Sequence, residues 1–288
     1  MEPIVVGLDG SDSSKEALRW AVGAASAHGV ELLLVSVVPQ GTDHEAVEEE
    51  MLRVWSTEAP GSGTVVRTEV VEGSAGPVLT GLAAGVGECL VVIGRGHGGW
   101  FPALHLGSAS HYLVHHVDRP ICVVPAGQAD YNAAHVVLGL DGSDGSIAAA
   151  AWTQRLAAAT GAKLTGVYAW EHSSTRMSNV AVGPDSQEDA EQACAGWADG
   201  LNATGVLAET KAVMGEPSEV LAAAVADAEA GLLVLGKRAE RRRSGPRLGC
   251  VSPRLLHRGA LPLGLVPPPR GLHARDPSGG APPADVAR

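Results

Sequence analysis

Short apolar runs rich in β-branched residues alternate along the chain with Ala-rich stretches whose apolar positions recur at helical spacing. This alternation is typical of β-α-β units built on a parallel sheet. In the first part of the chain the pattern predicts strands near residues 3–9, 31–38, 64–71, 89–93 and 120–124. It predicts helices over about 13–28, 43–57, 75–86 and 108–116. The predicted fold class is therefore α/β.

The first predicted helix carries start and packing signals. Ser13, followed three residues later by Glu16, matches the capping-box pattern and predicts Ser13 as the N-cap. Trp20 recurs with Ala17 and Ala24 on one apolar face. We expect this face to dock on the sheet, with Trp20 serving in packing and not in ligand binding.

The N-terminal pattern returns later in the chain. The segment PIVVGLDGSD, from residue 3, is repeated as HVVLGLDGSD from residue 135, an offset of 132 that pairs Asp9 with Asp141. The segments of the second copy that match after residue 211 stand at an offset of 142, so the second copy has gained ten residues within 171–211. We infer a tandem duplication of one domain of about 130 residues.

Two further segments differ in composition from the repeated units. Residues 126–134 (AGQADYNAA) join the copies and are interpreted as a linker. Residues 268–288 are rich in Pro, Gly and small polar residues. Such a tail buries too little apolar surface to offset the entropy of ordering, so we expect it to be disordered.

Charge and hydropathy narrow the class of partner. The chain has 21 Lys and Arg against 32 Asp and Glu, a net charge of −11, and its field therefore repels nucleic-acid backbones. No apolar run reaches the ~18 residues of a membrane span. The start, MEPIVVGLDGSD, lacks the basic and apolar regions of a signal peptide. We expect a cytoplasmic protein that binds neither nucleic acid nor membrane.

The sequence offers little support for metal binding or catalysis. Its four cysteines show no C-x-x-C or metal-ligand spacing. Cys89, Cys122 and Cys250 lie in or beside apolar stretches and are expected to pack as small hydrophobes. His111 and His115 form an i, i+4 pair, but no further ligand is evident nearby and closed zinc sites use four. No Ser-His-Asp or Cys-His arrangement follows from local spacing. We therefore assign no metal site and no catalytic residue.

Two loops of the first copy follow predicted strands and carry unusual chemistry. Ligands of open parallel sheets bind beyond the carboxyl ends of the strands. The first loop begins at Asp9, where Gly10 allows a sharp turn. The second, GRGHGGWFPALHLGSAS (94–110), has four glycines in its first six residues and enters a helix at Gly107 and Ser108. Converging backbone amides, a helix start and serine hydroxyls are suited to phosphate.

Two common nucleotide motifs do not fit this second loop. Gly94, Gly96 and Gly99 match G-x-G-x-x-G, but the dinucleotide fingerprint follows the first strand and opens directly into a helix. Here the glycines follow the fourth predicted strand. No G-x-x-x-x-G-K-[ST] occurs, which excludes a P-loop NTPase.

The chain resembles the universal stress protein family in both copies, over about 3–125 and 135–267. The resemblance rests on the VVGLDGS start, the V-x-V pair ending the second predicted strand, the G-x2-G-x9-G-[ST] pattern and the RPICVVP last strand. It implies two tandem five-stranded parallel sheets of order 3-2-1-4-5 with helices on both faces, the adenine nucleotide alpha hydrolase-like fold. It assigns one family domain to residues 1–125 and one to 135–267.

Many members of the family bind ATP, with or without Mg²⁺, and form dimers, whereas members without the loop pattern do not bind it. The positions here that fall in the family's ATP site are Asp9, Gly10, Ser11, Val37, Gly94, Gly96, His97, Gly107, Ser108 and Ser110. The resemblance implies that Asp9 contacts the adenosine and that the Val37 backbone meets adenine. Gly94, Gly107 and Ser108 would hold ribose and phosphates.

One position departs from the family pattern. His97 stands where the second glycine is expected, and Gly96 lies one residue earlier. Either the loop is shifted by one residue, or His97 adopts the required backbone conformation and its imidazole contacts a phosphate.

The second copy matches the ATP site less completely. The corresponding positions are Asp141, Ala169, Gly236, Ala239, Gly249 and Cys250. Ala239 replaces a glycine and Cys250 replaces the serine, which removes a hydroxyl donor. We expect weak or absent ATP binding there. The basic cluster that runs from Lys237 to Arg247 could attract an anion, but we favour a solvated loop.

Three functions remain open from the sequence. The first is an ATP-binding stress protein with a regulatory role, whose first copy holds the nucleotide. The second is a slow ATPase or nucleotide-processing enzyme, and the third is a nucleotide-free interaction module. The resemblance also implies that the last strands of the two copies pair within the chain, and it leaves open a further homodimer.

Overall fold

The structure is a computed structural model that describes residues 2–96, 107–171, 186–202, 208–237 and 251–268. The elements of the first half are β1 (Ile4–Gly7), α1 (Asp12–His28), β2 (Leu32–Val38), α2 (His44–Glu58), β3 (Val66–Glu72), α3 (Ala75–Val86), β4 (Leu90–Gly94), α4 (Ser108–His116) and β5 (Ile121–Val124). All nine agree with the sequence-based prediction, and their ends differ from it by at most two residues.

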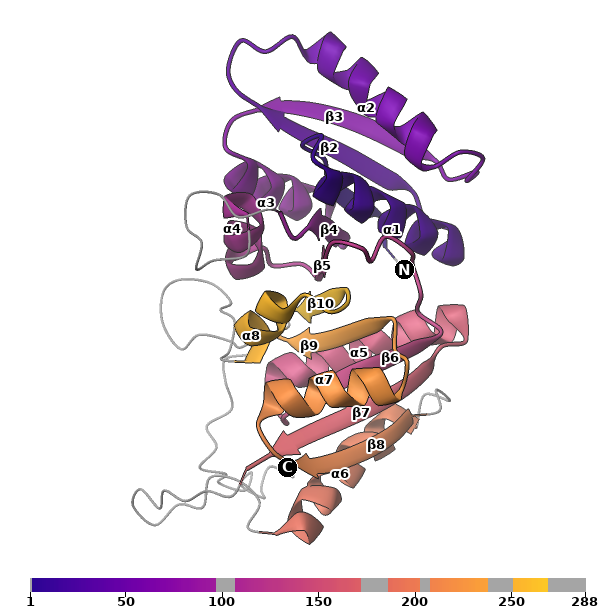
Figure 1. The fold of residues 1–288 in the computed structure, drawn as a ribbon, viewed down its shortest axis with the longest axis vertical. Helices are drawn as coiled ribbons and strands as arrows, with labels where there is room; N and C mark the ends of the chain where they lie inside the picture. The colour runs from indigo at the N-terminus through magenta and orange to yellow at the C-terminus, as the bar shows by residue number, and fades with distance from the viewer. Residues whose placement is uncertain (1, 97–106, 172–185, 203–207, 238–250, 269–288) are drawn as a thin grey trace, which may run out of the picture.

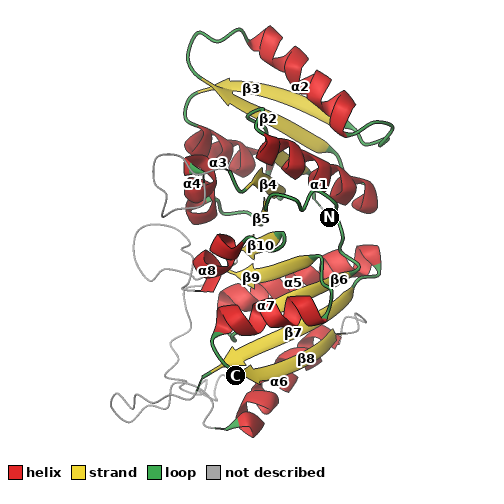
Figure 2. Ribbon diagram, viewed as in Figure 1, coloured by secondary structure: helices red, strands yellow, loops and turns green. Residues whose placement is uncertain are grey.

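The second half repeats this order of strands and helices. Its elements are β6 (His135–Leu140), α5 (Asp144–Thr160), β7 (Lys163–Trp170), α6 (Gln187–Asn202), β8 (Ala208–Met214), α7 (Pro217–Asp227), β9 (Leu232–Gly236), α8 (Val251–Arg258) and β10 (Leu263–Val266). The predicted α/β class with alternating strands and helices is confirmed (Figure 2).

The two halves share one ten-stranded sheet of order β3-β2-β1-β4-β5-β10-β9-β6-β7-β8. Within each half the strands are parallel and follow the predicted order 3-2-1-4-5. At the centre β5 and β10 pair antiparallel, with Cys122 opposite Gly264. The last strands therefore meet within the chain, and Figure 1 shows the halves above and below this junction.

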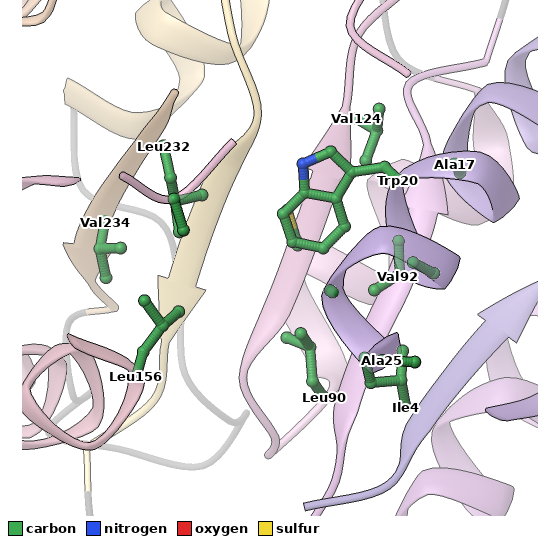
Figure 3. Packing of buried hydrophobic residues seen from close by; sticks show 14 of the residues in the cluster. Ile4, Ala17, Trp20, Ala25, Leu90, Val92, Val124, Leu156, Leu232 and Val234 are labelled. Atoms are coloured by element: carbon green, nitrogen blue, oxygen red, sulfur yellow. The ribbon is translucent and has the colours of Figure 1, made fainter. Parts of the chain in front are cut away.

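Both faces of the sheet are covered, as is typical of parallel sheets. Alternate residues of β1 enter different clusters: Ile4 and Val6 pack on the α1 side, and Val5 packs on the α3 and α4 side. The cluster on the α1 side continues across the junction into the second half. Figure 3 shows the buried Trp20 indole beside Val124 in the first half, and Leu232 of the same cluster in the second half. Trp20 thus packs in the core, as predicted.

The predicted N-cap of the first helix is wrong. Ser11 is the N-cap: its backbone is extended and its hydroxyl accepts a hydrogen bond from the Ser14 amide at 3.2 Å. Ser13 lies inside the first turn, is buried, and its hydroxyl accepts from the Gly96 amide at 3.0 Å. The Ser13 side chain is occupied by the loop after β4, so it cannot cap its own helix.

Residues 126–134 pack against the first half. Tyr131 lies edge-on to Trp20, with ring centroids 5.1 Å apart, and its hydroxyl is 2.9 Å from Nε2 of His28. The Tyr131 side chain occupies the space that a Cβ on Gly23 would need. The predicted linker is thus packed against α1. Of the tail predicted to be disordered, 269–288 lie outside the described residues.

Candidate functional site

A cavity of about 370 Å³ opens at the carboxyl ends of β1, β2 and β4. It is lined by Gly7, Leu8, Asp9, Ser11, Ser13, Ser14, Val35, Val37, Ala75, Leu79, Ile93, Gly94, Gly96, Gly107, Ser108, Ala109, Ser110 and Leu113. We call it pocket 1. The pocket follows from the strand order, in which β1 lies between β2 and β4. The connections that leave β1 and β4 run toward opposite edges of the sheet, and a crevice forms between them.

Asp9 is held by the turn that leads into α1. Its Oδ1 accepts hydrogen bonds from the Ser11 amide at 3.0 Å and the Ser11 hydroxyl at 2.6 Å. Desolvation raises the pKa of Asp9, but the hydrogen bonds from Ser11 and Ser14 outweigh it, so the pKa lies below its usual value. Asp9 is therefore an anion at neutral pH. Gly10, which forms the turn with φ +78°, does not line pocket 1.

The glycines after β4 bring the backbone close to α1. A Cβ on Gly94 would overlap the Ser13 carbonyl, and Gly96 has φ +74° and lies against Gly107. The Ser110 hydroxyl donates to the Gly94 carbonyl at 2.9 Å. These contacts give Gly94 and Gly96 structural reasons to be glycine.

Gly107 is different, because the residues that the structure describes leave room for a Cβ there. Its φ of −60° suits any residue, and the nearest atom to a Cβ would be Gly96 Cα at 3.5 Å, an ordinary contact. Gly107 is the N-cap of α4, and as a glycine it has no side chain with which to cap the helix. Ser108, Ala109 and Ser110 form the first turn and line pocket 1. The amides of a first helical turn have no partner within their own helix, so they can donate to an anion.

The structure brings most of the predicted residues together. Of those predicted for the ATP site, Asp9, Ser11, Val37, Gly94, Gly96, Gly107, Ser108 and Ser110 line pocket 1. His97 lies outside the described residues. Sequence reasoning missed Ser13 and Ser14, which line the pocket from the first turn of α1. The signal in the sequence was the SDSS run, whose hydroxyls need partners when a first helical turn is buried: Ser14 bonds locally to Ser11, and Ser13 bonds to Gly96.

A smaller cavity of about 210 Å³ occupies the matching place in the second half. It is lined by Gly139, Leu140, Asp141, Ser146, Val167, Ala169, Pro217, Leu221, Leu235, Gly236, Val251 and Ser252, and we call it pocket 2. The Asp141 carboxylate accepts from the Ser143 amide at 3.0 Å, as Asp9 does from Ser11. Val251 replaces Ala109 and Pro217 replaces Ala75, which adds apolar bulk.

Three of the residues predicted for the second site, Asp141, Ala169 and Gly236, line pocket 2. Ala239, Gly249 and Cys250 lie outside the described residues. The interpretation of Lys237 as part of a solvated basic loop is wrong. Lys237 is fully buried and its Nζ donates to the Val117 carbonyl of the first half at 3.0 Å. Burial lowers the pKa of Lys237 to about 7, against an opposing attraction by Asp118.

The histidines of α4 lie on its surface side. The His111 and His115 rings are 4.7 Å apart between centroids. Across the described ranges, no group of three or more His, Cys, Asp or Glu side chains is placed to hold a metal ion. Within the same ranges no helix has both the length and the apolar character that crossing a membrane requires.

Comparisons with known proteins agree with this fold. The model of the universal stress protein family matches residues 1–125 and 133–267. A universal stress protein of Mycobacterium tuberculosis is 28% identical, over 90% of this chain and 93% of the relative. One of Mycolicibacterium smegmatis is 27% identical, over 92% and 97%. A solved universal stress protein of Archaeoglobus fulgidus superposes with a TM-score of 0.72 at 16% identity, covering 93% of this chain and 98% of that one. This chain belongs to the universal stress protein family.

Proposed function

We propose that this universal stress protein is an ATP-binding regulatory protein that holds the nucleotide in pocket 1. In this proposal residues 1–125 and 135–267 are its two domains, and pocket 2 is a degenerate site. The observation that carries the proposal is Gly107, which begins a helix inside a pocket although neither its backbone angles nor the described residues around it require a glycine. Close approach of a ligand supplies the missing reason.

The electrostatics of pocket 1 support one orientation of the nucleotide. The ionised Asp9 repels phosphates and accepts hydrogen bonds from hydroxyls, so it suits the ribose. Its Oδ1 accepts both hydrogen bonds from Ser11, which fix the carboxylate at this end of the pocket. Val37, on the neighbouring strand β2, lines the same end and would offer its backbone to adenine.

The opposite wall of pocket 1 supports binding of the phosphates. Gly94 and Gly96 allow the backbone to approach closely, and the start of α4 supplies amides, the helix dipole and the Ser108 hydroxyl. The side chains lining this wall carry no negative charge. A triphosphate, with Mg²⁺ where the cation accompanies it, is the ligand that this wall suits.

Pocket 2 supports a weaker role. It is smaller, and its added bulk at Val251 stands at the start of α8, where pocket 1 has Ala109. We propose that the second half contributes mainly through its pairing with the first. The same argument predicts one bound nucleotide per chain.

Gly107→Val should abolish retention of ATP by the purified protein while leaving it folded. The described residues leave room for a Cβ at this position, and the valine methyls would fill the space beside the first amides of α4, so affinity should fall by tenfold or more. Mass spectrometry of nucleotide released from gently purified protein, followed by ATP titration, measures this. Gly85→Val is the matched control, because Gly85 is exposed on α3 and nothing approaches its Cβ position.

Three outcomes separate the candidate functions. Equal ATP affinity in the wild-type and Gly107→Val proteins would contradict this site. A wild-type protein that neither carries nor binds ATP is instead a nucleotide-free interaction module. Turnover of labelled ATP that stops in the Gly107→Val protein would favour a slow ATPase.

A further inference from the structure

Two cations cross the junction between the halves at matching positions. Arg95 directly follows β4, and Lys237 directly follows β9. The Arg95 amide donates to the Val124 carbonyl at 2.9 Å, and the Lys237 amide donates to the Val266 carbonyl at 2.7 Å. The two backbones are therefore fixed in the same way to β5 and β10, the strands that pair at the junction (Figure 1).

The side chains of both cations reach the last helix of the opposite half. Lys237 Nζ donates to the carbonyl of Val117, the C-cap of α4, at 3.0 Å. The Arg95 guanidinium donates to the carbonyl of His257 in the last turn of α8. A cation at a helix C-terminus is favourable because the unpaired carbonyls and the dipole are negative there.

The site on α8 is shaped to receive Arg95. Gly259 follows α8 with φ +56°, and its amide donates to the Leu255 carbonyl at 3.1 Å. A Cβ on Gly259 would overlap the Arg95 guanidinium. Glycine thus serves both the left-handed turn and the arriving side chain.

The backbone of Arg95 also holds the start of α4. Its carbonyl accepts a hydrogen bond at 3.0 Å from the amide of Gly107, the N-cap of α4. Arg95 therefore fixes the N-terminal end of α4, and Lys237 fixes the C-terminal end. Neither side chain lines pocket 1. Both ends of this nine-residue helix depend on contacts made with the second half.

We propose that Arg95 and Lys237 are positioning residues through which the second half sets the placement of the α4 N-terminus in pocket 1. The proposal rests on pocket 1 being the ATP site. A helix of this length moves as a rod, so releasing its C-terminal end displaces the amides at its other end. These amides belong to the phosphate wall of pocket 1 and not to the Asp9 wall.

Lys237→Met tests the proposal from the half that does not hold the nucleotide. Methionine matches lysine as far as Cε and lacks only the amine, and replacing a buried charge by an apolar residue is compatible with folding. ATP affinity should fall by about three- to tenfold, and adenosine affinity by less than twofold. A general loosening would weaken both ligands alike and would overturn the proposal, as would no change in either. Lys163→Met, at an exposed lysine of the same half, is the control.

Amide hydrogen exchange without nucleotide gives a second measurement. In Lys237→Met, exchange at residues 111–113, the first amides bonded within α4, should become faster by about three- to tenfold, while the amides of α1 keep their wild-type rates. Unchanged exchange rates in α4 would overturn the proposal, whether or not the wild-type protein binds ATP. Absence of ATP binding by the wild-type protein would contradict only the proposed function. Arg95→Met is the second variant, and it should weaken ATP more than adenosine in the same way.

Discussion

Gly94→Ala should lower the free energy of unfolding by about 3 kcal/mol. A Cβ at this position would overlap the carbonyl and hydroxyl oxygens of Ser13 in the first turn of α1. Neither the end of the buried strand β4 nor the start of the packed helix α1 can shift without disturbing the core. Denaturant unfolding followed by circular dichroism measures the loss.

The control for Gly94→Ala is a glycine at a position where a side chain has space. Gly81 is exposed on α3, and no atom of the described residues lies within 4 Å of its Cβ position, so Gly81→Ala should stabilise the protein by about 0.5–1 kcal/mol. Opposite signs for the two substitutions are expected. A loss below about 1 kcal/mol for Gly94→Ala would mean that α1 and β4 do not approach as closely as described.

Lys237→Met should change how stability depends on pH. Burial holds the pKa of Lys237 at about 7, far below the 10.5 of a solvated lysine. Below about pH 7 the amine is charged in both states, and the burial cost is present in full. Above it, the folded protein has released a proton that the unfolded chain still binds. Raising the pH therefore stabilises the wild-type protein by up to about 1.4 kcal/mol per pH unit.

The methionine variant lacks this proton release. The free energy of unfolding of the wild type minus that of the variant should increase by about 3 kcal/mol between pH 7 and pH 9.5. Urea titrations at several pH values measure it. Asp118→Asn should shift the rise to lower pH, because Asp118 attracts the charged amine. Parallel curves for the wild-type and methionine proteins would contradict a buried amine.

The elements of the fold could be predicted from local pattern because each helix face and strand is marked by its own residues. The Asp9 turn and the glycines after β4 were predictable for the same reason. The cap of α1 was not. Ser11 and Ser13 both have the chemistry of a cap, and the choice depends on Gly96, 83 residues further along the chain, which engages the Ser13 hydroxyl.

Lys237 illustrates the same limit. Its sequence neighbours are basic, which favours a solvated loop. Its burial follows from a partner 120 residues away, in the other half, and from the pairing of β5 with β10. The role of Gly107 is also invisible locally, because the sequence does not tell whether a glycine serves a turn, a close contact or a ligand.

The antiparallel β5–β10 pair lies within a single chain, which changes how the two halves meet. Between separate molecules such pairing weakens on dilution. Here a short connection keeps the halves at an effective concentration of roughly millimolar or more, whatever the amount of protein in the cell. Each half always has its partner, so substitutions that diminish one pocket leave the partnership intact. In a fused pair, one pocket can therefore keep its binding residues while the other loses them and its half continues to support the first through strand pairing.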